Sequence, residues 1–313
     1  MAPKIGYLLP TRESVMEGRH DAAPLLTLAE KAEDLGYDSI WVGDSVIAKP
    51  RHDPLTLLAG VASRTKTVKL GTAVLLPALR NPVLLAQQVA TLDQISEGRV
   101  ILGVGIAANA TSIRNEFEAV GVTFEKRVGR MMEGLALCKA LWTGEAVNWD
   151  GRWKLKSGVI GPIPAQPGGP PIWGGGSAPQ SLKRAAYHFD GWFPSGPTDT
   201  EVWRQQWNEV LKHVDVAGRK RNELDGAIYL TISVDDDATQ ANNRLNVFLE
   251  SYYQQPAQKL RQMQAGFGGP ATEALNWLNN YAKAGATHIV IRFVGDHQRN
   301  LEIFSKIRVD LGW

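Results

Sequence analysis

The sequence predicts a (β/α)8 barrel of the TIM type, with insertions over the mouth where the carboxyl ends of the strands meet. Two observations support this prediction. Short apolar runs alternate with amphipathic segments nearly from end to end of the 313 residues, and eight of these runs are typical of strands. A closed barrel accommodates eight such repeats without an exposed sheet edge and without a second domain.

The expected elements follow one another along the chain. Strands are predicted at residues 4–9, 39–42, 68–75, 100–104, 171–173, 191–193, 227–233 and 287–293. Helices are predicted at 24–35, 54–64, 82–95, 124–141, 178–188, 200–217, within a long region from 239 to 283, and at 300–309. Pro24, Pro54 and Pro82 begin three of these helices, where the missing N–H has no helical partner to lose.

Two stretches exceed the basic repeat. Residues 144–170 contain Asp150-Gly151 between tryptophan-flanked runs, which is typical of a hairpin, and then a Pro- and Gly-rich coil. Residues 239–269 contain Tyr252-Tyr253 and a glycine-rich segment. We expect the first insertion to pass over the mouth and the second to add a cap or a subunit contact, within one barrel domain spanning 1–313.

Composition narrows the class of protein. A net charge of +2 with dispersed Lys and Arg provides no basic surface for nucleic acid. No apolar run reaches membrane-spanning length and no signal-type segment precedes the first strand, so we expect a cytoplasmic protein without a membrane partner. The single cysteine, Cys138, lies at an apolar position of a predicted helix, which indicates a packed thiol rather than a disulfide.

Five motifs occur in an order that resembles a known family. They are LGYDSIWVGD at 35–44, the block at 70–82, SEGR at 96–99 with GVG at 103–105, PIWGGGS at 171–177, and AGAT at 284–287. Together they cover most of the chain and resemble the bacterial luciferase-like flavin-dependent oxidoreductases. The resemblance implies a homodimeric barrel that binds reduced flavin mononucleotide (FMN) or the deazaflavin coenzyme F420 in its mouth.

The resemblance implies two reactions. Monooxygenases of the family receive reduced FMN from a separate flavin reductase and oxidise a small organic substrate with oxygen, whereas deazaflavin members transfer hydride. Deazaflavin members often carry Asp-His after the second strand, where this chain has Asp44-Ser45. The FMN-dependent monooxygenase is therefore our main prediction, with F420-dependent hydride transfer and a non-catalytic flavin-binding barrel as alternatives.

The glycine turn at Gly174-Gly175-Gly176-Ser177 is a candidate phosphate site. It follows a predicted strand and precedes a helix, so its amides would face an anion at the positive end of the helix dipole. The alternative is a flexible turn in which Ser177 is an ordinary N-cap.

Small residues end the third and fourth predicted strands. Thr72, Ala73 and Val74 would let a flat flavin ring approach the backbone, and the resemblance implies a cis peptide bond at Ala73-Val74. Gly103 and Gly105 would make space beneath the ring. They also fit the G-x-G-x-x-A fingerprint of dinucleotide-binding folds, but that motif needs a helix that starts in the glycine turn, and residues 109–112 are typical of a loop.

The acid–base and substrate groups are weakly specified. Asp44 follows the second strand and either hydrogen-bonds the ligand or orients a loop, and Arg292, near the end of the last strand, could bind a phosphate or carboxylate. His288 begins that strand and is expected to be structural. No hydrolase triad or metal-binding motif occurs. Three residues are expected to contact substrate, with loop ion pairing or core packing as the alternatives: Arg12, Trp192 and Tyr252.

Overall fold

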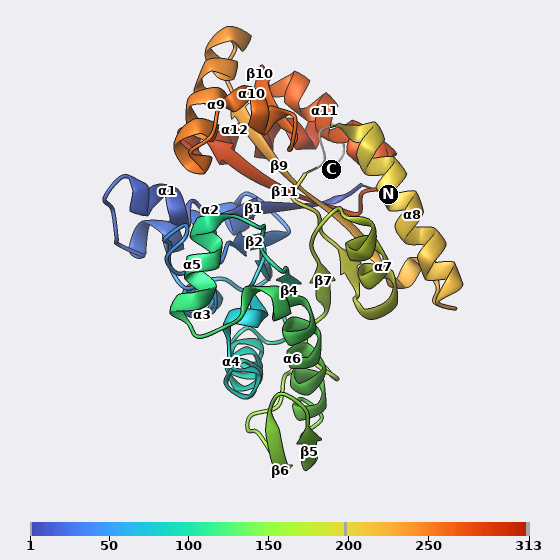
Figure 1. The fold of residues 1–313 in the computed structure, drawn as a ribbon. Coiled ribbons are helices and arrows are strands. Elements are labelled where there is room, and N and C mark those ends of the chain that lie inside the picture. Colours follow the sequence, from blue (N-terminus) through green and yellow to red (C-terminus); the bar gives the residue numbers. More distant parts are fainter. Residues whose placement is uncertain (1, 197–198, 311–313) are drawn as a thin grey trace.

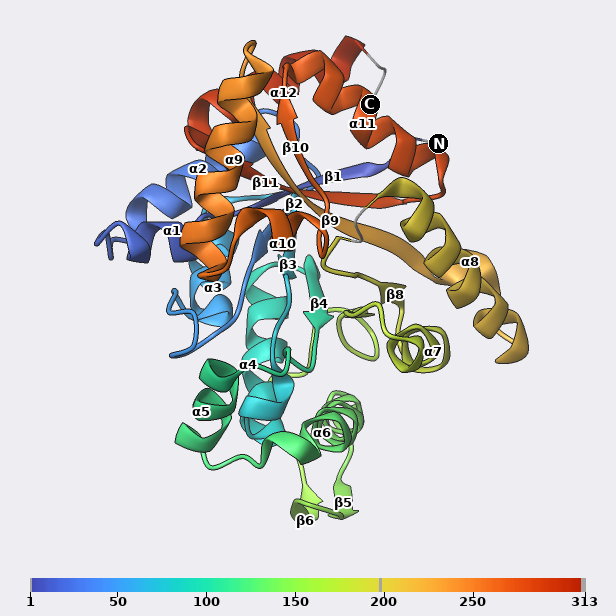
Figure 2. The ribbon, with the colours of Figure 1, turned by 45° about the horizontal axis from the view of Figure 1, so that its top comes forward.

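Eight parallel strands close into a barrel in the computed structural model, which describes residues 2–196 and 199–310 (Figure 1). Each strand pairs with the next around the ring, and the pairing of β8 with β9 closes it (Figure 2). The barrel fold predicted from the sequence is confirmed. Its strands are β1 (Lys4–Leu8), β2 (Ser39–Val42), β3 (Lys69–Thr72), β4 (Val100–Val104), β7 (Ile172–Gly174), β8 (Gly191–Trp192), β9 (Asp225–Val234) and β11 (His288–Val294).

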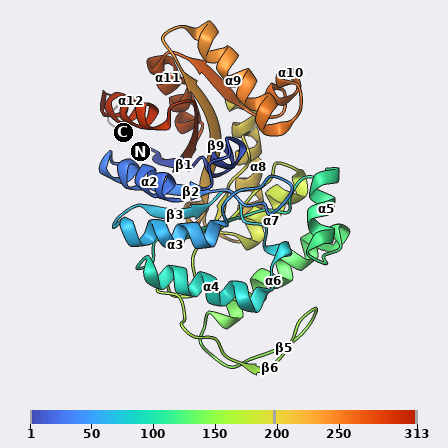
Figure 3. The same cartoon turned by 90° about the vertical axis from the view of Figure 1, so that its left-hand side faces the viewer.

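Helices surround the barrel, as Figure 3 shows. Asp53 and Asn81 cap two of them by accepting hydrogen bonds from Thr56 N (2.9 Å) and Val83 N (2.9 Å), directly before the prolines that begin each helix. The surrounding helices are α2 (Ala23–Asp34), α3 (Pro54–Arg64), α4 (Pro82–Ile95), α6 (Arg127–Leu141), α7 (Pro179–His188), α8 (Thr200–Val216), α11 (Ala271–Lys283) and α12 (His297–Asp310).

The first insertion forms the predicted hairpin of β5 (Val147–Asp150) and β6 (Lys154–Gly158). It packs on the outer side of α6, where Arg152 pairs with Glu133 and Arg130 lies 4.9 Å from the ring of Trp153. The hairpin therefore lies beside the helical layer and not over the mouth as predicted, because its tryptophan and arginine side chains contact α6 (Figure 3).

Two short helices occupy segments that the sequence indicated as loops. They are α1 (Thr11–Met16), which follows β1, and α5 (Thr111–Ala119). The α5 helix forms because one face buries Phe117 edge-on against Phe124, with ring centroids 5.2 Å apart.

The predicted helical region from 239 to 283 is also interrupted. It contains α9 (Ala238–Tyr253), α10 (Ala257–Arg261) and the strand β10 (Gly266–Gly269), which pairs in parallel with the carboxyl half of β9. Gln254 ends α9 in a left-handed conformation. Within the part of the chain that the structure describes, no helix is long and apolar enough to span a membrane.

Aromatic rings fill the barrel interior. Trp41 stacks on Trp173 at a centroid distance of 5.3 Å, and Phe193 lies 4.9 Å from Trp41. Gly71 and Gly191 admit these rings, since a Cβ at either position would overlap an indole. The interior is thus closed beneath the mouth by large side chains that face glycines on neighbouring strands.

His288 completes this layer and is uncharged. Its Nε2 lies 2.7 Å from Ser39 Oγ, which accepts a hydrogen bond from Trp41 Nε1, so the Ser39 hydroxyl is oriented to donate to an unprotonated imidazole nitrogen. Burial lowers the pKa of His288 to about 4. The prediction that this residue is structural agrees with its position.

Acid should weaken the fold through His288. Its pKa in the folded state lies below the ordinary value of 6.5, so its neutral form contributes fully above pH 6.5 and the contribution is lost as the pH falls towards 4. His288→Gln should reduce the pH slope of the unfolding free energy in this window by up to about 1.4 kcal/mol per pH unit, as measured by urea titrations. Replacing the exposed His20 by Gln should leave the slope unchanged, and equal slopes in all three proteins would contradict the assignment.

Candidate functional site

A bulge at the end of β3 lies in the mouth of the barrel. The Ala73-Val74 peptide bond is cis, which confirms the expectation from the resemblance. The strand ends at Thr72, three residues before the predicted end at 75, and the chain meets β4 again where Leu75 N donates to Gly103 O (2.7 Å). Ala73 and Val74 pack against the interior aromatic layer.

Gly103 and Gly105 make room for this bulge. A Cβ on Gly103 would overlap the carbonyl oxygen of Thr72, and one on Gly105 would lie 2.6 Å from Val74 Cγ2. The space beside these two glycines is therefore filled by the carbonyl group of Thr72 and the side chain of Val74. As a result, Ala73 and Val74 lie at the mouth. The next helix begins only at Thr111, so the dinucleotide-binding alternative does not fit.

The glycine turn offers fewer free amides than predicted. Gly175 N donates to Val104 O (2.8 Å), which leaves no amide at that position for a phosphate. Gly174 has a packing role, because a Cβ there would enter the ring of Phe189. Ala178 is the N-cap of α7, so Ser177 is not the cap. Among the described residues, the amides of Gly176 and Ser177 have no acceptor, and these two remain the candidate anion donors.

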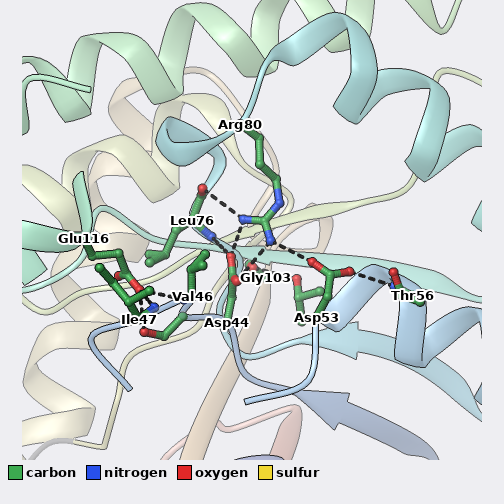
Figure 4. Close-up of polar contacts among 11 residues, drawn as sticks. Asp44, Val46, Ile47, Asp53, Thr56, Leu76, Arg80, Gly103 and Glu116 are labelled. Atoms are coloured by element: carbon green, nitrogen blue, oxygen red, sulfur yellow. Dashed lines mark hydrogen bonds and ion pairs between the residues drawn. The ribbon is translucent and has the colours of Figure 1, made fainter. Parts of the chain in front are cut away.

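Asp44 orients the loop that follows the bulge (Figure 4). Its carboxylate accepts hydrogen bonds from Leu76 N (2.8 Å) and from both terminal nitrogens of Arg80 (2.5 and 3.0 Å), and its side chain is 2% exposed. Arg80 also pairs with Asp53 at 3.2 Å. Of the two roles considered for Asp44, the structure shows the second, because both of its oxygens are already hydrogen-bonded within the protein.

Glu116 fixes the loop after β2 from the opposite side (Figure 4). One carboxylate oxygen accepts hydrogen bonds from Ser45 Oγ (2.8 Å) and from the amides of residues 46–48. Sequence reasoning missed Glu116 because residues 109–112, where α5 begins, were expected to form a loop. Glu116 and Asp44 together hold residues 44–53 in place.

Basic and tyrosine side chains converge over the mouth. Arg12 lies 4.5 Å and Arg292 lies 4.6 Å from the ring centre of Tyr252, so three residues predicted to contact ligand are neighbours. We call the whole group the arginine–tyrosine cluster, and its members are Arg12, Glu13, Lys49, Arg51, Tyr252, Tyr253 and Arg292. Lys49 and Arg51 were missed, although their position directly after the second strand was a signal that the loop would reach the mouth.

Trp192 does not line the mouth of the barrel, so the prediction that it contacts substrate is wrong. Its indole nitrogen donates to Gly176 O (2.9 Å), and its ring lies 5.7 Å from Trp203 and 6.0 Å from Trp207 on α8. Side chains alternate along a strand, so Trp192 faces the helices while Phe193 faces the interior.

The remaining sequence candidates have structural roles. Cys138 is buried, its thiol donates to Pro82 O, and burial raises its pKa to about 12. Over the described ranges, no three His, Cys, Asp or Glu side chains form a group that could hold a metal ion.

A closed β/α barrel with polar groups gathered at the carboxyl ends of its strands has the architecture of a TIM-barrel enzyme. Residues 3–302 match the model of the luciferase-like monooxygenase family, and the chain belongs to this family of oxidoreductases. It is 31% identical over 316 residues to the F420-dependent glucose-6-phosphate dehydrogenase of Kineococcus radiotolerans, covering 90% of each chain.

Other relatives cover different lengths. The chain is 34% identical over 219 residues to the 5,10-methylenetetrahydromethanopterin reductase of Archaeoglobus fulgidus, and this match spans 69% of the chain but only 62% of the reductase. The solved monooxygenase RslO1 of Streptomyces bottropensis shares the fold with a TM-score of 0.84 and 22% identity, over 99% of this chain and 100% of that one. An F420-dependent secondary alcohol dehydrogenase has a TM-score of 0.83 and 20% identity, over 98% of both chains.

Removing the Asp44 carboxylate should destabilise the protein. Asp44→Ala leaves Leu76 N–H and part of the Arg80 guanidinium without partners in a buried setting, and we expect a loss of roughly 3 kcal/mol in the free energy of unfolding. Urea titrations measure this loss in the free energy of unfolding. The matched control is Glu201→Ala, which removes the exposed carboxylate that pairs with Arg204 and should change little. Equal effects of the two substitutions would contradict the role of Asp44.

Proposed function

We propose that this enzyme is an F420-dependent oxidoreductase that exchanges hydride between the deazaflavin and a small organic substrate. The observation that carries the proposal is its similarity to an F420-dependent dehydrogenase over 90% of both chains. This reverses the order of our sequence-based predictions, in which the FMN-dependent monooxygenase came first. The monooxygenase remains the second candidate because the family as a whole carries that description.

The mouth has features that suit a flat ring with a phosphate-bearing tail. The Ala73-Val74 bulge would support the ring, and the layer of Trp41 and Phe193 beneath it excludes water from below. The free amides of Gly176 and Ser177 would hold the phosphate. When bound, the deazaflavin supplies a carrier of hydride, and the protein supplies position and surroundings.

The departure from the Asp-His pair of deazaflavin members has a local explanation. Ser45 donates its hydroxyl hydrogen bond to Glu116 and accepts one from Lys49 N (2.9 Å). Its side chain thus helps to fix the loop after β2 and to set the direction of Lys49.

Cofactor titration distinguishes the candidates. F420 should bind the purified protein at least about tenfold more tightly than FMN, measured by equilibrium dialysis of each cofactor. Turnover should then bleach oxidised F420 under anaerobic conditions, with secondary alcohols and sugar phosphates as the first substrates tested. Tighter FMN binding with substrate-dependent oxygen uptake would contradict the proposal and favour the monooxygenase, whereas cofactor binding without turnover across the panel would favour a binding protein.

A negative charge at the glycine turn should weaken cofactor binding. Ser177→Asp places a carboxylate beside the amides proposed to hold the phosphate, so F420 affinity should fall by about tenfold or more. The fold should survive, since an acidic residue near the start of a helix interacts favourably with its dipole. Ser177→Ala is the control and should stay within about twofold of the parent, because the proposed donors are amides. Unchanged affinity in Ser177→Asp would remove the phosphate from this turn.

A further inference from the structure

Four cations of the arginine–tyrosine cluster lack a carboxylate partner. Among the described residues, Arg12, Lys49, Arg51 and Arg292 form no ion pair with any Asp or Glu. Arg292 is 1% exposed and Arg12 is 8% exposed. Buried cations that form no ion pair are costly, so their assembly at one place requires a reason.

Several of their hydrogen-bond donors are also unused. Nη1 of Arg292, and both Nε and Nη1 of Arg12, are buried without a partner. Arg99 shows how a buried guanidinium is fully hydrogen-bonded elsewhere in the protein. Arg99, also 8% exposed, donates to four backbone carbonyls and to the hydroxyl of Thr65.

The hydroxyl group of Tyr252 is also available to donate a hydrogen bond to a ligand. Arg51 Nη2 donates to Tyr252 Oη (3.1 Å), so the phenol hydrogen of Tyr252 is free to donate. Arg292 Nη2 donates to Tyr253 Oη (3.3 Å), and Tyr253 in turn contacts Gln264. The cluster therefore presents guanidinium and phenol donors together.

The charge of the cluster is strongly positive. Burial lowers the pKa of Lys49 to about 8, and the charges of Arg12, Arg51 and Arg292 lower it in the same direction. Glu13 is the one acidic member. Burial raises the pKa of its carboxyl, against the attraction of Arg292, and Glu13 forms no ion pair with the cations.

The cluster borders the bulge. A Cβ added to Gly43 would overlap the guanidinium of Arg51 and would lie 3.6 Å from Ala73 O. Arg51 therefore lies next to the backbone on which the cofactor ring is proposed to rest. An anion bound by Arg51, Arg12 and Arg292 would be held beside the reacting face.

We propose that the arginine–tyrosine cluster binds an oxyanion of the substrate, and that the substrate is a dianion such as a phosphate monoester. This proposal rests on the proposed function, because it treats the bulge as the place of the cofactor ring. Three arginines and a lysine facing one carboxyl exceed the charge that a monocarboxylate would neutralise. Planar guanidinium forks with free N–H groups match the several acceptors of a phosphate.

The test is a thermal titration of the full chain with inorganic phosphate, with and without saturating F420, at constant ionic strength. Phosphate should raise the unfolding midpoint in both series, since a ligand that binds only the folded state stabilises it. Arg12→Gln and Arg51→Gln should each weaken the apparent phosphate affinity by about tenfold or more. Arg19→Gln, which removes an exposed arginine paired with Glu17 just beyond α1, is the matched control and should respond like the parent.

A second readout separates binding from structural support. Without phosphate, Arg12→Gln should melt no lower than the parent, because it removes one of several mutually repelling charges. A large destabilisation in that variant, or a phosphate response equal to the parent's, would overturn the proposal.

Two other outcomes would assign a different ligand to the cluster. Acetate binding more tightly than phosphate would replace the dianion by a carboxylate, and displacement of F420 by phosphate would show that the cluster holds the cofactor's own anion. Either result would overturn the proposal. Failure to bind F420 bears on the proposed function alone, because the phosphate series without cofactor tests the cluster separately.

Discussion

The close approach of β3 and β4 is the constraint on which the mouth of this barrel depends. Two positions on β4, Gly103 and Gly105, carry no Cβ, and the volume they leave is filled by the Thr72 carbonyl and the Val74 side chain. The chain can therefore leave the sheet at Ala73 and rejoin it at Leu75. A side chain on either glycine would push the bulge out of place, because a packed interior has little room to relax.

Two carboxylates hold the loops around this bulge. Asp44 binds the loop after β3 through Arg80, and Glu116 binds the loop after β2 through four donors. Both oxygens of Asp44 are hydrogen-bonded, whereas Glu116 accepts its four hydrogen bonds on one oxygen and its other oxygen is buried without a partner among the described residues. Their effect is to fix the backbone on two sides of the mouth, and the residues between them project towards its centre.

The arginine–tyrosine cluster contrasts with the fully hydrogen-bonded carboxylate of Asp44. Elsewhere the protein pairs its buried charges, as with Arg80, or surrounds them with carbonyl groups, as with Arg99. At the mouth it leaves guanidinium nitrogens without partners. Proteins retain such destabilising arrangements where function requires them, since a ligand then supplies the missing interactions.

Signals that act over a few neighbouring residues explain which strands and helices could be predicted from the sequence. All eight strands, the flanking helices and the hairpin were predictable because apolar periodicity, proline at helix starts and Asp-Gly turns act over a few residues. The helices α1 and α5 and the strand β10 were missed because contacts with distant segments help to stabilise them, as when Glu116 of α5 accepts hydrogen bonds from residues 45–48.

The sequence by itself determined the succession of β/α repeats and the position of the glycine turn, because each is encoded in neighbouring residues, whereas the cis bond at Ala73-Val74 was expected from the family resemblance. Only the tertiary structure decided which side chains meet. Trp192 turned towards α8 and Phe193 towards the interior, a difference of one residue that depends on strand register. Arg12, Arg51 and Arg292 come from three different strand ends, and Tyr252 from the end of α9, so their meeting depends on closure of the ring and not on spacing along the chain.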